Sequence, residues 1–337
     1  MSGASIPYHL RPHKAVDRRI FVDLLSRIER WRPLSEYVYL SMGAYPLEDH
    51  KLIHRTLGVT RLIAFDYDPA IVARQTFNRP IGSCHCVEKS SGDVVAELDQ
   101  VLDQCGFGDP AGVIVWLDYT DPKKLGEQIR EFQSLLDRLS AGDVVRVTVN
   151  AHPNEMIEAS GGKPLLKEER RAKQFQSLQG RIKEFMPSWA SADHMNETDL
   201  PKVIAESFAA AALKALPVSG ALTFRPLSMV RYADSAQMLS MTGVVAKRSD
   251  EGELLARLGI QTWPFASDTW SDIHKLVVPN LTLRERLFLE REVVTTGPDQ
   301  IVNALGFDAA GEISVADFID SYKRYYRFYP TLLTAEL

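Results

Sequence analysis

The segment from residue 37 to residue 68 constrains the fold most. It reads YVYLSMGAYPLEDHKLIHRTLGVTRLIAFDYD, which predicts a buried strand over 37–42, a tight turn at Gly43-Ala44-Tyr45, a helix closed by Gly58 and a second strand over 61–66. In doubly wound folds such a unit places a nucleotide-like ligand over the first turn, and a carboxylate at the tip of the second strand can hold a ribose. We therefore expect this segment to bind a cofactor.

The rest of the chain extends this unit into a larger sheet. Further apolar strands are predicted over 84–87, 113–117 and 144–149, each separated from the next by a helix, and such alternation gives a parallel sheet. Two long strands over 221–232 and 237–247 then follow, joined by a turn too short for a crossover, so they must be antiparallel. The predicted fold class is α/β, a doubly wound seven-stranded sheet with an antiparallel final hairpin.

Changes in pattern along the chain suggest domain boundaries. Residues 1–36 form an N-terminal helical lead, whose helix over 18–31 is expected to pack across the sheet edge. The sheet domain spans 37–248, with a helical insertion over 150–219. Residues 249–337 are predicted to form a helical C-terminal domain, because T-x-x-E at Thr282 and S-x-x-D at Ser314 are typical helix starts.

Composition excludes several classes of protein. The formal net charge is −5, which argues against a wholly basic nucleic-acid coat but leaves room for a local basic patch. No apolar run approaches the roughly 18 residues that a membrane helix needs, and the N-terminus lacks a signal-peptide pattern. With three cysteines and no disulfide framework, a cytoplasmic location without a membrane partner is the simplest expectation.

Parallel strands followed by an antiparallel hairpin resemble the class I S-adenosylmethionine-dependent methyltransferases. A nicotinamide-binding domain would more usually continue with another parallel unit, so an oxidoreductase is expected only if the hairpin is wrong. The resemblance implies S-adenosylmethionine as the cofactor. It places the Gly43-Ala44-Tyr45 turn under the methionine part of the cofactor. It also implies that Asp66 accepts hydrogen bonds from the ribose hydroxyls. It also implies that the adenosine is flanked by Tyr67 and Asp68, and that the loop containing Lys89 and Ser90 approaches the adenine.

The same resemblance assigns the catalytic end of the site. The tip of the fourth strand, Asp118-Tyr119, would face the transferred methyl group, with Asp118 orienting or deprotonating the acceptor and Tyr119 lining the acceptor slot. The alternative is an ordinary turn, because Asp-Tyr-Thr-Asp-Pro is also good turn chemistry. The sequence also departs from the family at the first turn, which is usually richer in glycine and where the bulk of Tyr45 could close the loop.

Other polar clusters have plainer readings. Asp49 lies in the first turn of a helix, where negative charge suits the helix dipole. His50 and His54 are four residues apart on that helix, but spacing fixes no third ligand, so no metal site is predicted.

The acceptor is the least determined part of the prediction. The basic segment over 163–183 belongs to the insertion, which overhangs the acceptor side in the resembling fold, and would suit a phosphate-bearing acceptor such as a nucleotide or nucleic acid. It could equally be a solvated helix face. Aromatic and basic residues interleaved over 322–329 could stack bases or form a homo-oligomer interface.

These observations leave two main hypotheses of function. The first is methyl transfer from S-adenosylmethionine to an unidentified acceptor. The second is a non-catalytic scaffold subunit of a complex that binds the cofactor or a nucleotide.

Overall fold

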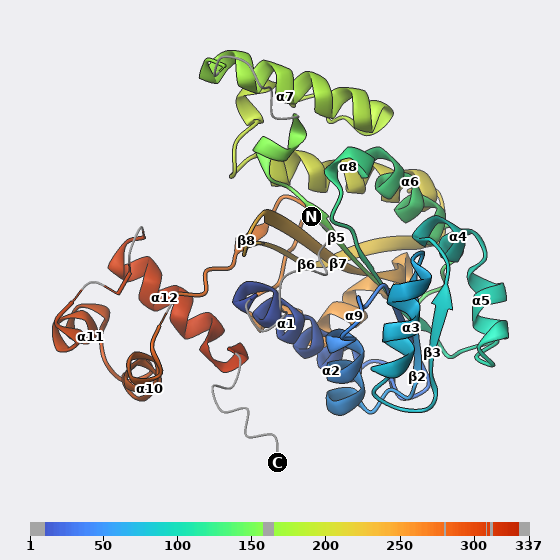
Figure 1. Ribbon diagram of the computed structural model, residues 1–337, viewed down its shortest axis with the longest axis horizontal. Helices are drawn as coiled ribbons and strands as arrows, with labels where there is room; N and C mark the ends of the chain where they lie inside the picture. The colour runs from blue at the N-terminus through green and yellow to red at the C-terminus, as the bar shows by residue number, and fades with distance from the viewer. Residues whose placement is uncertain (1–10, 158–164, 280, 308, 311–312, 330–337) are drawn as a thin grey trace.

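One mixed sheet organises the molecule (Figure 1). The computed structural model describes residues 11–157, 165–279, 281–307, 309–310 and 313–329. Its strands are β1 (Val38–Ser41), β2 (Arg61–Asp66), β3 (Cys84–Glu88), β4 (Val113–Asp118), β5 (Val144–Asn150), β6 (Leu222–Ala233), β7 (Gln237–Lys247) and β8 (Ile273–Lys275). They lie in the order β3-β2-β1-β4-β5-β7-β6-β8.

The topology confirms the predicted fold class. Strands β1 to β5 are parallel, β7 inserts antiparallel beside β5, and β6 pairs antiparallel with β7. The sheet has one strand more than predicted, because the short β8 pairs in parallel with β6 at its edge. The oxidoreductase alternative required the hairpin to be absent, so the topology argues against it.

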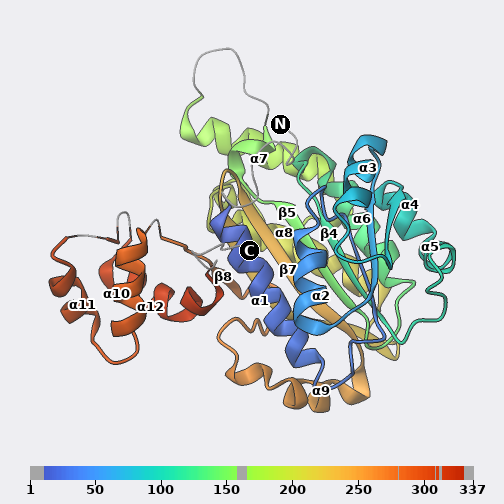
Figure 2. The same ribbon diagram turned by 60° about the horizontal axis from the view of Figure 1, so that its bottom comes forward.

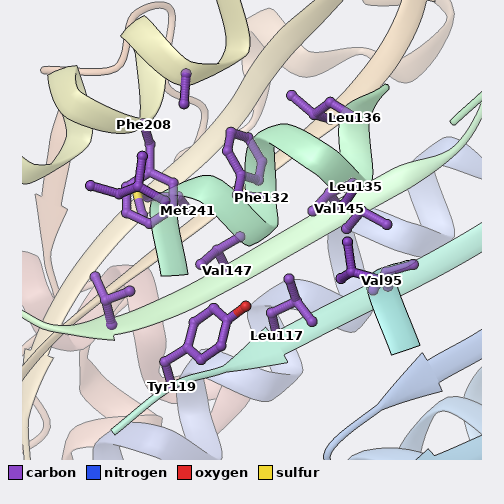
Figure 3. Packing of buried hydrophobic residues seen from close by; sticks show 14 of the residues in the cluster. Val95, Leu117, Tyr119, Phe132, Leu135, Leu136, Val145, Val147, Phe208 and Met241 are labelled. Atoms are coloured by element: carbon purple, nitrogen blue, oxygen red, sulfur yellow. The ribbon is translucent and has the colours of Figure 1, made fainter. Parts of the chain in front are cut away.

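Helices cover both faces of the sheet, which is why its central strands read as continuous apolar runs. One core lies under α4 (Ser91–Ala96), α5 (Leu98–Gln104), α6 (Leu125–Leu136) and α8 (Leu200–Ala215). Figure 3 shows part of it, where Phe132 of α6 and Phe208 of α8 meet Val147 of β5. The other core lies under α1 (Pro12–Ile28), α2 (Glu48–Leu57) and α9 (Glu251–Leu258). Helix α3 (Pro69–Phe77) packs on β2 and β3.

The N-terminal helix differs from its prediction in extent and position. It begins at Pro12, six residues before the predicted start at residue 18, because proline is well tolerated in the first helical turn. Helix α1 also lies on a face of the sheet rather than across its edge: the ring of Phe21 makes an edge contact with Trp116 of the central strand β4, with centroids 5.5 Å apart. An apolar stripe in the sequence predicts that a helix is buried, but it does not predict which part of the sheet the helix covers.

The C-terminal third is mostly helical and also contributes β8. Helices α10 (Leu283–Glu292), α11 (Pro298–Leu305) and α12 (Val315–Tyr325) stand together beyond β8 (Figures 1 and 2). The chain just before β8 packs on the main body, where Trp263 Nε1 donates to Asp23 of α1 at 2.6 Å. The division into separate domains stays a prediction.

Helix α7 (Lys167–Ile182) carries most of the predicted basic segment, whose first residues, 163 and 164, lie outside the described residues. Over the described parts of the chain, no helix is both long enough and apolar enough to cross a bilayer.

Candidate functional site

The carboxyl ends of β2, β1 and β4 meet at one edge of the sheet, since these strands are parallel neighbours. Asp66 ends β2, Gly43 follows β1 and Asp118 ends β4. The structure therefore brings together the three positions that the sequence assigned to the ribose, the methionine part and the methyl group. Doubly wound folds hold their ligands at this edge.

The turn after β1 is tightly wound. Gly43 has a φ of +64°, and a Cβ placed there would lie 2.7 Å from His50 Cε1 and 2.7 Å from Leu47 Cδ2. Ala44 and Leu47 also have positive φ values, 44° and 53°. A non-glycine residue in this left-handed region costs on the order of 1–3 kcal/mol. The surrounding contacts must therefore stabilise the turn.

Helix α3 supplies those contacts. Gln75 Nε2 donates to the carbonyl oxygens of Met42 at 2.8 Å and Ala44 at 3.4 Å, and Asn78 Nδ2 donates to the carbonyl oxygen of Tyr45 at 3.0 Å. The Arg74 guanidinium lies over the Tyr45 ring, 3.5 Å from its centroid. The bulky side chain of Tyr45, which distinguishes this turn from the family pattern, is thus packed against α3.

A buried ionic cluster lies beneath the turn. Asp49 accepts hydrogen bonds from Tyr39 Oη at 2.7 Å, Ser41 Oγ at 2.6 Å and His50 Nδ1 at 3.1 Å, while His50 Nε2 donates to the Ile63 carbonyl oxygen at 3.0 Å. Both ring nitrogens face acceptors, so His50 is an imidazolium and has no lone pair for a metal.

The pKa values of this cluster follow from the pairing. Burial by itself would raise the pKa of Asp49, but His50 and the two hydroxyl donors hold it well below its ordinary value. Burial would lower the pKa of His50, but the Asp49 carboxylate and the Ile63 carbonyl raise it. Sequence reasoning assigned Asp49 to the helix dipole and missed the cluster, because its partners come from β1 and β2.

Asp66 carries a half-buried carboxylate at the end of β2. Its Oδ1 accepts from the backbone N–H of Asp68 at 2.9 Å, which fixes the orientation of the carboxylate. Burial is the main cause that raises the pKa of Asp66, followed by the charge of Asp68. Tyr67 beside it is 78% exposed. Asp68 caps α3 by accepting from Ala70 N at 2.8 Å, so its side chain already has a structural role.

The loop after β3 is also internally bonded. Lys89 Nζ lies 2.6 Å from Glu97 Oε2. Ser90 caps α4, accepting from Asp93 N at 3.2 Å and donating to Asp93 Oδ2 at 2.6 Å. In this arrangement both side chains hold the loop, and the loop backbone is the part available to approach an adenine.

At the tip of β4 the two predicted catalytic residues point to opposite faces of the sheet. Asp118 forms an ion pair with Lys14 of α1, and its Oδ1 is buried with no hydrogen-bond partner among the described residues. Tyr119 points into the core under α6, as Figure 3 shows, and its hydroxyl donates to Glu131 Oε2. Burial, reinforced by Glu131, raises the pKa of Tyr119 well above its ordinary value. Sequence reasoning missed Lys14, because a residue more than a hundred positions away from Asp118 gives no local signal.

Comparison with known families decides the class of protein. A family model described as "Putative O-methyltransferase" matches residues 6–337. The chain belongs to this family of methyltransferases. Its strand order is the one predicted from the resemblance to class I enzymes, and both findings agree with the predicted cofactor, S-adenosylmethionine.

More distant comparisons add description only. No curated protein sequence matches this methyltransferase significantly. Among solved structures it is similar to the LepI complex with S-adenosylmethionine, at 10% identity and a TM-score of 0.36, covering 66% of this chain and 46% of LepI. It therefore spans less than half the length of LepI.

Two shorter structures are covered more fully. The N-methyltransferase NodS from Bradyrhizobium japonicum WM9 matches at 9% identity and a TM-score of 0.34, covering 69% of this chain and 97% of that one. A putative methyltransferase in complex with the Haloferax volcanii Trm112 activator matches at 11% identity and a TM-score of 0.31, covering 70% and 93%.

The residues of this methyltransferase fit the cofactor at two points. At Gly43 the positive φ and the close approach of His50 and Leu47 require a glycine, and they hold the tight turn at the end of β1. At Asp66 a half-buried, oriented carboxylate stands at the end of β2, where it can accept hydrogen bonds from two vicinal hydroxyls. Both points lie on the edge to which Asp118 also belongs.

Proposed function

We propose that this protein transfers a methyl group from S-adenosylmethionine to an oxygen atom of an acceptor held at the end of β4. The observation that carries the proposal is the placement of Gly43, Asp66 and Asp118 on three neighbouring strand ends of a class I sheet. The description of the family as putative O-methyltransferases supports oxygen as the acceptor atom.

Each residue has a separate task in the proposal. The turn at Gly43 supports the methionine part, and Asp66 accepts hydrogen bonds from the ribose hydroxyls. When bound, the cofactor supplies an electrophilic methyl carbon on a positively charged sulfur. Holding the acceptor oxygen in line with that carbon is the main contribution a protein can make to such a transfer.

Asp118 is proposed to receive the acceptor. Lys14 keeps one of its oxygens in an ion pair, and the buried Oδ1, which has no protein donor among the described residues, would have to become accessible to receive the proton of an acceptor hydroxyl. As the oxygen gains the methyl group, its proton passes to Asp118, leaving a methyl ether or ester and S-adenosylhomocysteine. General-base assistance of this kind contributes about 10²–10⁴ in rate. Tyr119 would support the acceptor slot from the core side through its bond to Glu131.

A phosphate-bearing acceptor is supported by the charge on α7. Lys167, Arg170 and Lys173 are exposed on this helix. Arg181 has a different role, since it donates to the carbonyl oxygens of Pro122 and Met156 and anchors the helix. Exposed cations along one helix suit the phosphates of a nucleotide or nucleic acid.

Transfer can be tested without knowing the acceptor. The protein is incubated with methyl-labelled S-adenosylmethionine and separate pools of small metabolites and of RNA, and labelled products are identified by mass spectrometry. We expect label to enter one pool with the wild type and to fall by at least about tenfold with Asp118→Asn. Equal labelling by both proteins would remove Asp118 from the reaction.

The second candidate function is a scaffold that binds the cofactor without turning it over. It is favoured by the turn after β1, where Ala44 and Leu47 hold left-handed conformations and Tyr45 packs under Arg74. Saturable binding of S-adenosylhomocysteine with no label in any pool would support this alternative.

A further inference from the structure

A cavity of about 630 Å³ lies at the same edge of the sheet as the proposed site. It is bounded by the turn between β6 and β7, by β8 and the chain after it, by the start of α1 and by the C-terminal helices. Its volume falls in the range of small-molecule sites. The polar residues that line it are His13, Glu197, Arg231, Tyr232, Gln237, Lys275 and Glu285.

Two cations stand side by side on its wall. Arg231 of β6 and Lys275 of β8 are register partners on neighbouring parallel strands, so their side chains leave the sheet on the same face. Like charges opposite one another on adjacent strands are destabilising. Their side-by-side position therefore calls for a compensating negative charge.

The protein supplies only part of that charge, through the carboxylates of Glu197 and Asp199, which act on Arg231 without forming an ion pair with it. Arg231 Nη1 donates to the Glu197 carbonyl oxygen at 3.0 Å and to Gln237 Oε1 at 3.5 Å, which are neutral acceptors. Within the described residues, neither Arg231 nor Lys275 has a carboxylate at ion-pair distance. Glu197 and Glu285 also line the cavity, but the Glu285 carboxylate accepts from Thr282 N at 2.7 Å and caps α10. Burial is the main cause that lowers the pKa of Arg231, and the charges of Glu197 and Asp199 offset it only in part.

The remaining walls are apolar. The chain after β8 and the C-terminal helical region contribute Leu276, Val278, Leu281, Phe307 and Ile313. A ligand that satisfies both parts has an apolar body against these side chains and an anionic group at Arg231 and Lys275.

The cavity adjoins the catalytic edge through the start of α1. His13 lines the cavity, with Nδ1 3.0 Å from Asp234 Oδ1 and Nε2 accepting from Val278 N at 3.0 Å. The next residue, Lys14, forms the ion pair with Asp118. The cavity and Asp118 thus contact adjacent residues of the first turn of α1.

We propose that this cavity binds the methyl acceptor, which is then a small and largely apolar molecule carrying one anionic group, carboxylate or phosphate, that pairs with Arg231 and Lys275, rather than a nucleic acid bound along α7. Naming the occupant as the acceptor rests on the proposed function, whereas its binding chemistry does not.

The first test uses 8-anilinonaphthalene-1-sulfonate, a fluorescent apolar anion, titrated into the full-length protein. We expect one saturable site, with affinity reduced about tenfold in Arg231→Gln and in Lys275→Gln through loss of a charge-assisted contact. Arg231→Lys should retain most of the affinity. Lys247→Gln, which removes an exposed lysine from the far end of the hairpin, is the matched control and should bind as the wild type does.

Displacement of this probe then identifies the anionic group. We expect 2-naphthoate or 2-naphthyl phosphate to compete at least about tenfold better than neutral 2-naphthol, and the tighter of the two names the head group. Equal competition by all three, or equal probe affinity in all variants, would overturn the proposal. The affinity for S-adenosylhomocysteine is measured on the same variants and should not change. If the wild type fails to bind that compound while the anion site persists, the proposed function fails and the anion site stands.

Discussion

One buried ion pair should contribute strongly to the attachment of helix α1 to the sheet. Asp17 Oδ2 lies 2.5 Å from Arg146 Nη2, and the two side chains are 0% and 2% exposed. The Arg146 guanidinium lies over the rings of Phe21 and Trp116, 4.8 and 4.7 Å from their centroids. It also donates to Thr242 Oγ1 at 2.7 Å. We therefore expect Asp17→Asn to be severely destabilising.

The magnitude follows from this burial. The amide side chain in Asp17→Asn would leave a buried guanidinium without its carboxylate, and removing one partner of a buried pair costs about 3–5 kcal/mol. That is a large part of a typical unfolding free energy of about 5–15 kcal/mol. The assay is urea unfolding followed by far-UV circular dichroism. Glu29→Gln, which changes an exposed acid just after the same helix, is the control and should alter the unfolding free energy by less than about 0.5 kcal/mol.

A double variant separates pairing from packing. Asp17→Leu with Arg146→Met removes both charges, so it should be more stable than Asp17→Asn, because the desolvation cost disappears with the pair. If Asp17→Asn unfolds within about 1 kcal/mol of the wild type, or if the double variant is no more stable, the reasoning about this pair is wrong.

Three further predictions concern the edge of the sheet. Gly43→Ala should lower the unfolding free energy by about 1–3 kcal/mol and weaken S-adenosylhomocysteine binding, whereas Gly58→Ala, with a similar φ but nothing within 4 Å of an added Cβ, should show the backbone strain alone. The pKa of His50 is raised in the folded state, so the stability that its charged form contributes is fully present below about pH 6.5. This contribution is lost as the pH rises through the folded-state pKa. The difference in unfolding free energy between the wild type and His50→Gln should therefore shrink as the pH rises through the folded-state pKa. Lys14→Met should reduce turnover, measured by label transfer, at least about tenfold, because Lys14 pairs with Asp118. The dissociation constant of S-adenosylhomocysteine, measured by calorimetry, should not change. A parallel loss of cofactor binding would assign Lys14 a structural role instead.

The fold was largely predictable because its information is local. Alternating apolar strands and helices specify a parallel sheet, and the short turn, which spans residues 234–236 in the structure, specifies the hairpin. Strand β8 was not predictable, because three residues, Ile273 to Lys275, carry no periodicity and form a strand only beside β6.

The candidate site was predictable only at the strand tips. Parallel topology alone places Asp66 and Asp118 on one edge. The groups that surround them come from distant segments: Gln75 reaches the turn from α3, Lys14 reaches Asp118 from α1, and Arg231 meets Lys275 through an edge pairing. The spacing of residues in the sequence does not predict such contacts.

The affinity for S-adenosylhomocysteine, measured by calorimetry on the wild type, Asp66→Ala and Asp99→Asn, tests the central claim most directly. Asp99 is an exposed acid on α5 and serves as the control. We predict saturable binding to the wild type, binding weakened by about 1–3 kcal/mol in Asp66→Ala through lost charge-assisted hydrogen bonds, and no change in Asp99→Asn. Equal affinity in Asp66→Ala, or binding of NAD with none of S-adenosylhomocysteine at millimolar concentration, would contradict a cofactor site over Gly43 and Asp66.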